Sequence, residues 1–141
     1  MATYACRQRP MKPLGIAIAE DDWFLAEYLC DELGALGHAI VGRARTGEGL
    51  IDLVARERPD LVLVDVRLAQ GSDGLAAAKE VQERFDVPAI AATGELTAAE
   101  AEAAGLLGIL SKPYSSAALR SVLAGAGAWL ESGSSRPFLR R

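Results

Sequence analysis

The chain has 141 residues, of which 50% are hydrophobic and 24% charged, with a formal net charge of −4 and a pI near 5.0. This length fits one domain with a single core, and no apolar run is long enough to span a membrane. The acidic balance argues against nucleic acid as a partner, and the lack of a secretory signal pattern favours a cytoplasmic location.

The first predicted element is an apolar run at residues 14–19, short enough for a strand, which ends in acidic residues. From Asp22, a residue type that caps helices, apolar residues recur at helical spacing until Gly37. A short strand is expected at residues 38–42. These three elements predict the first strand, helix and strand of an alternating fold.

The middle of the chain contains the most informative strand. A helix over residues 47–58 ends before Pro59, and the run at 61–64 consists only of branched aliphatic residues. Such a run is typical of a parallel strand buried on both faces. Asp65 follows it, so we expect this carboxylate at the crevice where ligands bind in open α/β sheets.

The rest of the chain repeats the same alternation. A helix over 75–85 precedes a strand at 87–92, and a short helix over 97–104 precedes a strand at 106–110. A helix over 116–130 is the last predicted element. The alternation predicts a parallel sheet with helices on both faces. The length favours a flavodoxin-like, doubly wound α/β sheet of five strands, in the order 2-1-3-4-5, over a barrel of about 250 residues.

Polar side chains follow four of these strands: Glu20 and Asp21, Asp65, Thr93, and Lys112. The carboxyl ends of parallel strands lie along one edge, so these residues should lie close together. Each close carboxylate pair costs about 4 kcal/mol at about 4 Å with an effective dielectric near 20. Lys112 and a divalent cation are both candidates for the balancing charge. Oxygen ligands without His or Cys select Mg²⁺.

With Mg²⁺ bound at this edge, Asp65 is a candidate nucleophile for phosphoryl transfer. A carboxylate can attack a phosphoryl group to give an acyl phosphate when the charge on the transferring oxygens is neutralised. Lys112 can pair with one phosphoryl oxygen, the Thr93 hydroxyl can donate to another, and Gly94 leaves room beside them. Pro113 makes a cis Lys112–Pro113 peptide an option.

Four segments, IAEDD, LVLVDV, AATG and LSKPY, occur in this order at the ends of the expected strands. Together they resemble the receiver domain of two-component response regulators over about residues 14–130. The resemblance implies that Asp65 is the phosphorylation site, with a histidine kinase or histidine phosphotransfer protein as donor and slow self-dephosphorylation. It also implies a cis bond between Lys112 and Pro113.

The resemblance also implies ligands for the metal and for the phosphoryl group. The implied Mg²⁺ ligands are the side chains of Glu20, Asp21 and Asp65 and the backbone carbonyl of Arg67. The implied phosphoryl ligands are Thr93 and Lys112.

Five residues near the site depart from the family pattern or have an open role. Receivers usually carry Tyr or Phe as a switch where this chain has Ile109, and a single-domain subgroup with a Phe-Ala-Thr-Gly signature has Phe where this chain has Ala91. Arg67 and Glu95 either tune dephosphorylation or pair with each other. Trp23 is either an exposed contact near the site or an anchor on the helix side.

We expect a stand-alone receiver domain at residues 14–131, with a flexible leader at 1–13 and a tail at 132–141. The roughly ten residues after the last helix are too few for a DNA-binding domain. The domain would therefore signal through protein contacts, with an unknown downstream target and a homodimer as an option. We expect no enzymatic turnover.

Three other functions stay open. The first is an interaction module that is never phosphorylated, which Ile109 motivates. The second is a phosphate sink for another regulator. The third is a Mg²⁺-dependent phosphohydrolase with an aspartyl nucleophile. The haloacid dehalogenase pattern has a second Asp two residues after the nucleophile, where this chain has Arg67, which argues against the third.

Overall fold

The structure is a computed structural model that describes residues 12–133. Most of the predicted leader and tail lies outside the described residues. In chain order the elements are β1 (Gly15–Ala19), α2 (Trp23–Ala35), β2 (Ala39–Ala44), α3 (Gly47–Glu57), β3 (Leu61–Asp65), the 3-10 helix η1 (Ala69–Gly71), α4 (Gly74–Phe85), β4 (Ala89–Thr93), α5 (Ala98–Ala103), β5 (Gly108–Ser111) and α6 (Ser116–Ser132).

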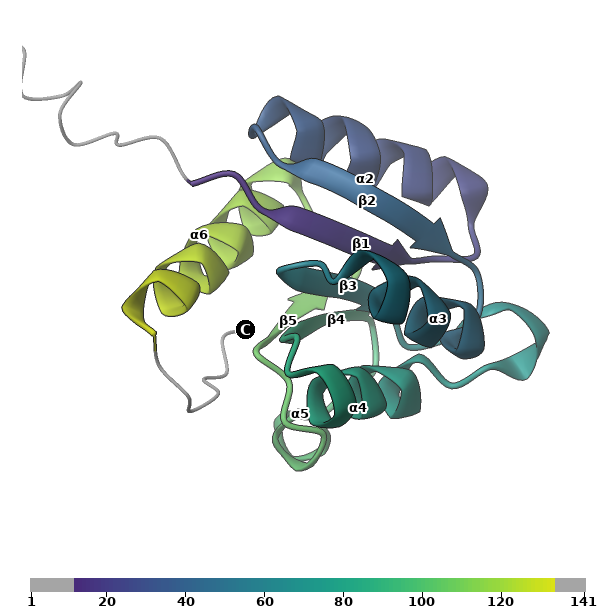
Figure 1. The fold of residues 1–141 in the computed structure, drawn as a ribbon. Helices are drawn as coiled ribbons and strands as arrows, with labels where there is room; N and C mark the ends of the chain where they lie inside the picture. Colours follow the sequence, from purple (N-terminus) through teal and green to yellow (C-terminus); the bar gives the residue numbers. More distant parts are fainter. Residues whose placement is uncertain (1–11, 134–141) are drawn as a thin grey trace, which may run out of the picture.

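The strands form one sheet in the order β2-β1-β3-β4-β5, and each neighbouring pair is parallel. This confirms the predicted flavodoxin-like fold and its strand order. Helices α2 and α6 pack on one face, and α3, α4 and α5 pack on the other (Figure 1). β3 lies in the middle of the sheet, and all five of its residues are buried.

Alternate residues of each strand enter two separate apolar clusters. Ile16 and Ile18 pack on the side of α2 and α6, whereas Ala17 and Ala19 pack on the side of α3, α4 and α5. This alternation follows from the pleat of a strand, which turns successive side chains to opposite faces. Burying one large aliphatic side chain contributes about 1.5–3 kcal/mol. The two clusters therefore hold the strand ends in a fixed relation to one another.

Each of the five strands differs from its predicted bounds by one or two residues, and β2 and β4 illustrate the cause. β2 continues to Ala44, beyond the predicted end at residue 42, because Arg43 and Ala44 still pair with Ile18 and Ala19 of β1. β4 begins at Ala89, later than predicted. Tertiary pairing, rather than local sequence preference, sets both ends.

Three smaller features fall outside the site. His38 is buried, and its Nδ1 accepts a hydrogen bond from the Leu14 N–H at 3.0 Å, so its role is structural. Cys30 is a free thiol, as predicted, while Cys6 lies outside the described residues. Within residues 12–133, no helix combines the length and the hydropathy needed to cross a bilayer.

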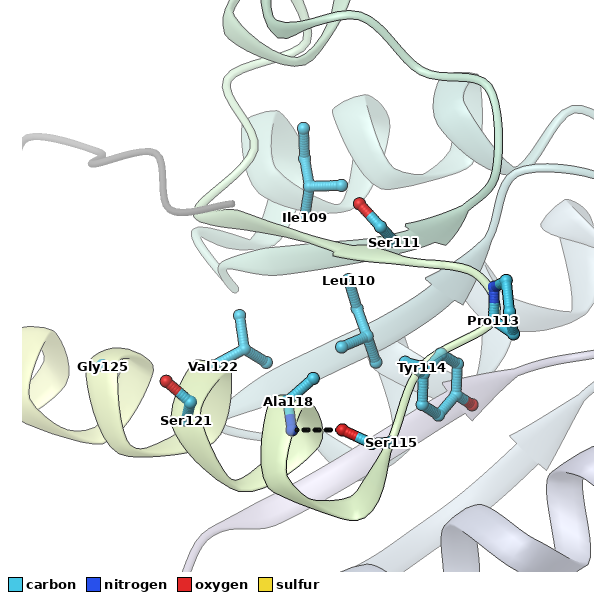
Figure 2. A pocket seen from close by; sticks show the side chains of 10 residues that line it. All are labelled: Ile109, Leu110, Ser111, Pro113, Tyr114, Ser115, Ala118, Ser121, Val122 and Gly125. Atoms are coloured by element: carbon cyan, nitrogen blue, oxygen red, sulfur yellow. Dashed lines mark hydrogen bonds between the residues drawn. The ribbon is translucent and has the colours of Figure 1, made fainter.

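A groove of about 550 Å³ lies along β5 and α6. Figure 2 shows Leu110 pointing from β5 toward α6, whereas Ile109 points to the opposite side of the strand. The lining residues are Ile109, Leu110, Ser111, Pro113, Tyr114, Ser115, Ala118, Ser121, Val122 and Gly125. Lys112 is therefore flanked in sequence by two residues of this groove.

Candidate functional site

The register of the sheet aligns the carboxyl ends of the strands, where the polar residues lie, along one edge. Ala19 at the end of β1 pairs with Val64, the residue before Asp65. On the other side, Thr93 at the end of β4 pairs with Ser111 at the end of β5. The residues that follow these positions therefore leave the sheet at the same edge, as the sequence predicted.

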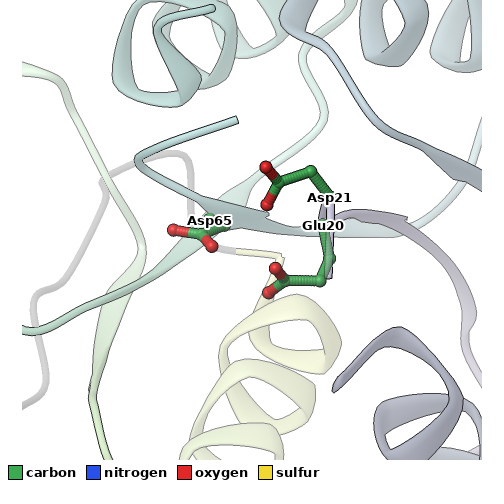
Figure 3. A group of neighbouring side chains, drawn as sticks. All are labelled: Glu20, Asp21 and Asp65. Atoms are coloured by element: carbon green, nitrogen blue, oxygen red, sulfur yellow. The ribbon is translucent and has the colours of Figure 1, made fainter. Parts of the chain in front are cut away.

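Three carboxylates meet at this edge. One oxygen atom from each of Glu20, Asp21 and Asp65 lies within 4.8 Å of the other two. Figure 3 shows the three carboxylates turned toward a shared space, with Asp65 coming from β3 and the other two from the end of β1. Glu20 is 5% exposed and Asp65 is 9% exposed, so water screens this cluster only weakly.

Lys112 lies against two members of the cluster. Its Nζ donates a hydrogen bond to Asp65 Oδ2 at 2.8 Å and lies 3.6 Å from Glu20 Oε1. Burial lowers the pKa of the Lys112 ammonium, but the hydrogen bond to Asp65 and the charges of Glu20 and Asp65 outweigh burial. The net pKa of Lys112 is therefore raised. The single ammonium of Lys112 cannot balance the charge of all three carboxylates in the cluster.

The Glu20 carboxyl has a strongly raised pKa. Burial, together with the nearby charge of Asp65, raises it to a net value of about 7. The Asp22 N–H, which donates to Glu20 Oε2 at 3.2 Å, and the Lys112 ammonium act in the opposite direction. Carboxyl groups whose pKa is raised toward pH 7 in this way are common in functional sites.

The cluster fits a hard divalent cation. All its donors are carboxylate oxygens, which Mg²⁺ and Ca²⁺ prefer over nitrogen or sulfur ligands. A bound cation would also relieve the cost of ionising Glu20 beside Asp65. The chemistry of the donor set therefore agrees with the Mg²⁺ site that the sequence predicted.

The Arg67 carbonyl, the fourth predicted metal ligand, lies in a short antiparallel bridge after β3. One backbone hydrogen bond of this bridge runs from the Gly74 N–H to the Val66 carbonyl at 2.8 Å. The other runs from the Leu68 N–H to the Ser72 carbonyl at 3.2 Å. Neither bond uses the Arg67 carbonyl, and its role as a ligand stays a prediction.

Thr93 and Lys112 approach Asp65 from the next two strands. Thr93 is 8% exposed, and its Oγ1 accepts a hydrogen bond from the Glu95 N–H at 3.2 Å. The Lys112 N–H donates to the Thr93 carbonyl at 2.8 Å, which joins the ends of β4 and β5. The Lys112–Pro113 peptide is cis, as the resemblance implied.

One pocket of about 370 Å³ contains every predicted site residue. It is lined by Glu20, Asp21, Asp22, Leu25, Asp65, Arg67, Thr93, Gly94, Glu95 and Lys112. Asp22 caps α2 through hydrogen bonds from the N–H groups of Phe24 and Leu25, which confirms its predicted capping role. Leu25 was not among the predicted site residues. Its position in the first turn after the acidic residues could have indicated the pocket.

The structure shows the contacts of three residues near the pocket whose roles the sequence left open. Arg67 and Glu95 pair with each other, with Arg67 Nη2 at 2.7 Å from Glu95 Oε1 and 2.5 Å from Oε2. Trp23 is 61% exposed and makes an edge-to-face contact with Phe24, whose exposure is 79%. Trp23 is therefore an exposed residue beside the site.

Ile109, at the position of the usual switch aromatic, is 5% exposed and belongs to the core on the side of α3, α4 and α5. Sequence reasoning did not identify Tyr114, two residues after Lys112. Within the described part of the chain, the Tyr114 hydroxyl is buried without a hydrogen-bond partner, and burial raises its pKa. Its place in the LSKPY segment is the signal that could have drawn attention to it.

Comparison with known proteins shows the family of the chain. A family model described as the response regulator receiver domain matches residues 16–124. Phyllosphere-induced regulator PhyR of Methylorubrum extorquens is 34% identical over 113 residues, which are 77% of this chain and 41% of PhyR. Transcriptional regulatory protein PdtaR of Mycobacterium tuberculosis is 32% identical over 106 residues, which are 73% of this chain and 51% of PdtaR. The chain thus spans about half the length of these relatives.

A solved structure shows the same fold. The signal receiver domain of a modulated diguanylate cyclase from Desulfovibrio desulfuricans G20 has a TM-score of 0.78 and 25% identity, and the match covers 87% of this chain and all of that one. The family model covers well over half of the chain, and the fold agrees with it. This chain therefore belongs to the response regulator receiver domain family.

Proposed function

We propose that Asp65 accepts a phosphoryl group, in the cytoplasm, from a histidine kinase or a histidine phosphotransfer protein, and that the domain then signals through protein contacts. One observation carries the proposal: Asp65 belongs to the acidic cluster and also contacts Lys112 at 2.8 Å. The same carboxylate is thus placed to bind a cation and to lie beside a cationic phosphoryl ligand. The relatives are named as regulators, which is consistent with signalling rather than turnover.

The transfer step follows from these positions. An Asp65 carboxylate oxygen forms a bond to phosphorus while the P–N bond of the donor's phosphohistidine breaks. The electron pair of that bond stays on the imidazole nitrogen, and because the other ring nitrogen of the phosphohistidine carries a proton, the donor leaves as a neutral imidazole. Lys112 moves from Asp65 to one phosphoryl oxygen, and the Thr93 hydroxyl donates to another.

Bound Mg²⁺ would supply neutralisation of the charge on the transferring oxygens. Glu20, Asp21, Asp65 and the Arg67 carbonyl would hold it. Because Glu20 is buried, water screens its carboxylate only weakly, and the electrostatic attraction between Glu20 and a divalent cation is stronger.

The donor protein has an apolar contact available beside the pocket. Trp23 and Phe24 are both exposed, and they lie between Asp22 and Leu25, which line the pocket. A protein that inserts a phosphohistidine into this pocket must cover the surface around its mouth. Burying two aromatic side chains there would supply binding energy close to the reacting atoms.

The groove along β5 and α6 is the proposed surface for downstream partners or for a second copy. Lys112 lies between Ser111 and Pro113, and both line the groove (Figure 2). If the backbone of Lys112 shifts as its side chain turns toward a phosphoryl oxygen, Ser111 and Pro113 would shift with it. This route does not need an aromatic switch at Ile109.

Acetyl phosphate with MgCl₂ tests the proposal through the intact mass of the whole chain. We expect the mass of one phosphoryl group to be added to the wild type and not to Asp65→Asn. Asp52→Asn is the matched control, because it makes the same Asp-to-Asn substitution at an exposed position of α3. This variant should still be phosphorylated. Phosphotransfer from candidate histidine kinases would then identify the donor.

The alternative of an unphosphorylated interaction module also has one observation in its favour. Lys112 already pairs with Asp65, and Ile109 is buried in the core. Both side chains of this ion pair therefore have a partner without a phosphoryl group on Asp65. The same mass measurement separates the two functions. A wild-type chain with no adduct, in Mg²⁺ and excess acetyl phosphate, would support the module and end the phosphoacceptor proposal.

A further inference from the structure

The Arg67–Glu95 ion pair lies at the mouth of the phosphoacceptor pocket. Arg67 belongs to the loop after β3 and Glu95 to the loop after β4, and both line the pocket with Asp65. The guanidinium meets both carboxylate oxygens of Glu95, and the two side chains are 78% and 68% exposed. The pocket thus contains a second cationic side chain besides Lys112. Its partner, Glu95, lies in the loop after β4 and is not part of the acidic cluster.

The backbone of both residues is tied to the site. The Arg67 N–H donates to Asp65 Oδ1 at 3.1 Å, and the Glu95 N–H donates to Thr93 Oγ1 at 3.2 Å. Arg67 is thereby held beside the predicted phosphoacceptor, and Glu95 is held beside Thr93, a predicted ligand of the phosphoryl group. Only the long side chain of Arg67 has to change its rotamer for the guanidinium to turn from Glu95 into the pocket.

An exposed ion pair of this kind contributes little to stability, because water screens it and both side chains lose rotamer freedom. A phosphoryl group on Asp65 carries nearly two negative charges and three acceptor oxygens, and a guanidinium binds such a group with two parallel hydrogen bonds. The phosphoryl group is therefore a stronger partner for Arg67 than Glu95 is.

We propose that Arg67 is a phosphoryl-binding residue which Glu95 holds aside until Asp65 is phosphorylated. The inference rests on the proposed function and adds a residue to it. In the reaction with acetyl phosphate, the Asp65 oxygen–phosphorus bond forms, the bond from phosphorus to the acetate oxygen breaks, and acetate leaves with the electron pair. Arg67 and Glu95 exchange no proton; the guanidinium only changes partner, which releases the Glu95 side chain and the loop before α5.

The test measures the affinity of the full chain for beryllofluoride, a phosphoryl mimic, in MgCl₂ by isothermal titration. Arg67→Ala should weaken binding roughly tenfold, the usual effect of losing a charge-assisted hydrogen bond. Glu95→Gln should strengthen binding because it removes the competitor for Arg67. Arg84→Ala with Glu80→Gln is the matched control, an exposed Arg–Glu pair near the end of α4, and it should leave the affinity unchanged.

The decisive variant is Arg67→Ala combined with Glu95→Gln. If Arg67 contacts the phosphoryl group, this double variant stays roughly tenfold weaker than the wild type, because the guanidinium is missing. If Arg67 only neutralises Glu95, removing both charges restores wild-type affinity, and that result overturns the inference. As a direct readout, the side-chain N–H signals of Arg67 in the wild type should shift on adding beryllofluoride, and unchanged signals would also overturn it.

The outcomes separate the inference from the proposed function. A wild type that binds beryllofluoride, with affinity lost in Asp65→Asn, supports the phosphoacceptor site whatever the Arg67 variants do. A wild type that binds none overturns both.

Discussion

The Lys112 ammonium lies directly beside Asp65, with Nζ 2.8 Å from Oδ2. This contact ties β5 to β3 although β4 lies between them in the sheet. In this structure Lys112 balances part of the charge of the acidic cluster. Under the proposed function it would also bind the phosphoryl group that Asp65 receives.

Lys112→Ala should separate these two roles. Removing the ammonium leaves the carboxylates without their cation, so Mg²⁺ should bind more tightly, while adduct formation from acetyl phosphate should slow by tenfold or more. Titration calorimetry measures the first effect and intact mass the second. Lys79→Ala on the exposed side of α4 is the control, and it should change neither. Slower phosphorylation with weaker Mg²⁺ binding would contradict this division of roles.

Mg²⁺ should stabilise the protein by binding the folded state only. At about 100 times its dissociation constant, a ligand adds about 2.7 kcal/mol to the free energy of unfolding, and the midpoint of thermal unfolding rises accordingly. Asp21→Asn should abolish most of this rise, because Asp21 contributes to the cluster. Asp22→Asn should keep it, because asparagine also caps helices. An equal loss in both variants would assign Asp22 to the metal.

The pKa of Glu20, about 7, predicts how stability depends on pH without metal. The unfolded value is about 4.3, so between that pH and about 7 the folded state binds the additional proton. The free energy of unfolding therefore falls as pH rises through this window and then levels off. Glu20→Gln should lack this fall and should be more stable than the wild type at pH 8, by an amount on the order of 1–3 kcal/mol.

Chemical denaturation in EDTA at pH 4 and pH 8 checks this sign. The two proteins should be nearly equal at pH 4, where Glu20 of the wild type is protonated in the folded state and mostly protonated in the unfolded state. Excess Mg²⁺ at pH 8 should favour the wild type instead, since glutamine is a poorer ligand. A glutamine variant less stable than the wild type at pH 8 in EDTA would show that Glu20 is ionised without cost.

Gly74 is the glycine whose replacement should do the most damage near the site. A Cβ atom at this position would lie 1.9 Å from the Asp65 backbone carbonyl oxygen, closer than any real contact allows. Gly74→Ala must push α4 away from the end of β3, and we expect a loss of at least about 3 kcal/mol in unfolding free energy.

Gly34→Ala is the control for this substitution. Gly34 lies in α2, and a Cβ atom there would meet nothing within 4 Å. Alanine should stabilise the helix by about 0.5–1 kcal/mol. Thermal unfolding of both variants tests the contrast, and a mild effect of Gly74→Ala would show that the loop after β3 can yield.

The sequence alone determined the fold and the membership of the site. Continuous apolar runs alternating with helical spacing specify a parallel sheet, and a parallel sheet places all carboxyl strand ends along one edge. Glu20, Asp65, Thr93 and Lys112 were therefore predictable as neighbours from their places in the chain, before any distance was known.

Only the tertiary structure decided which of these neighbours touch. Rotamers and packing from distant segments decide two ion pairs, Lys112 with Asp65 and Arg67 with Glu95. They also decide the burial of Glu20, which raises its pKa. The same dependence set the end of β2. Local sequence encodes preferences over a few residues, whereas contacts between loops and burial are fixed by elements that the chain brings together only when it folds.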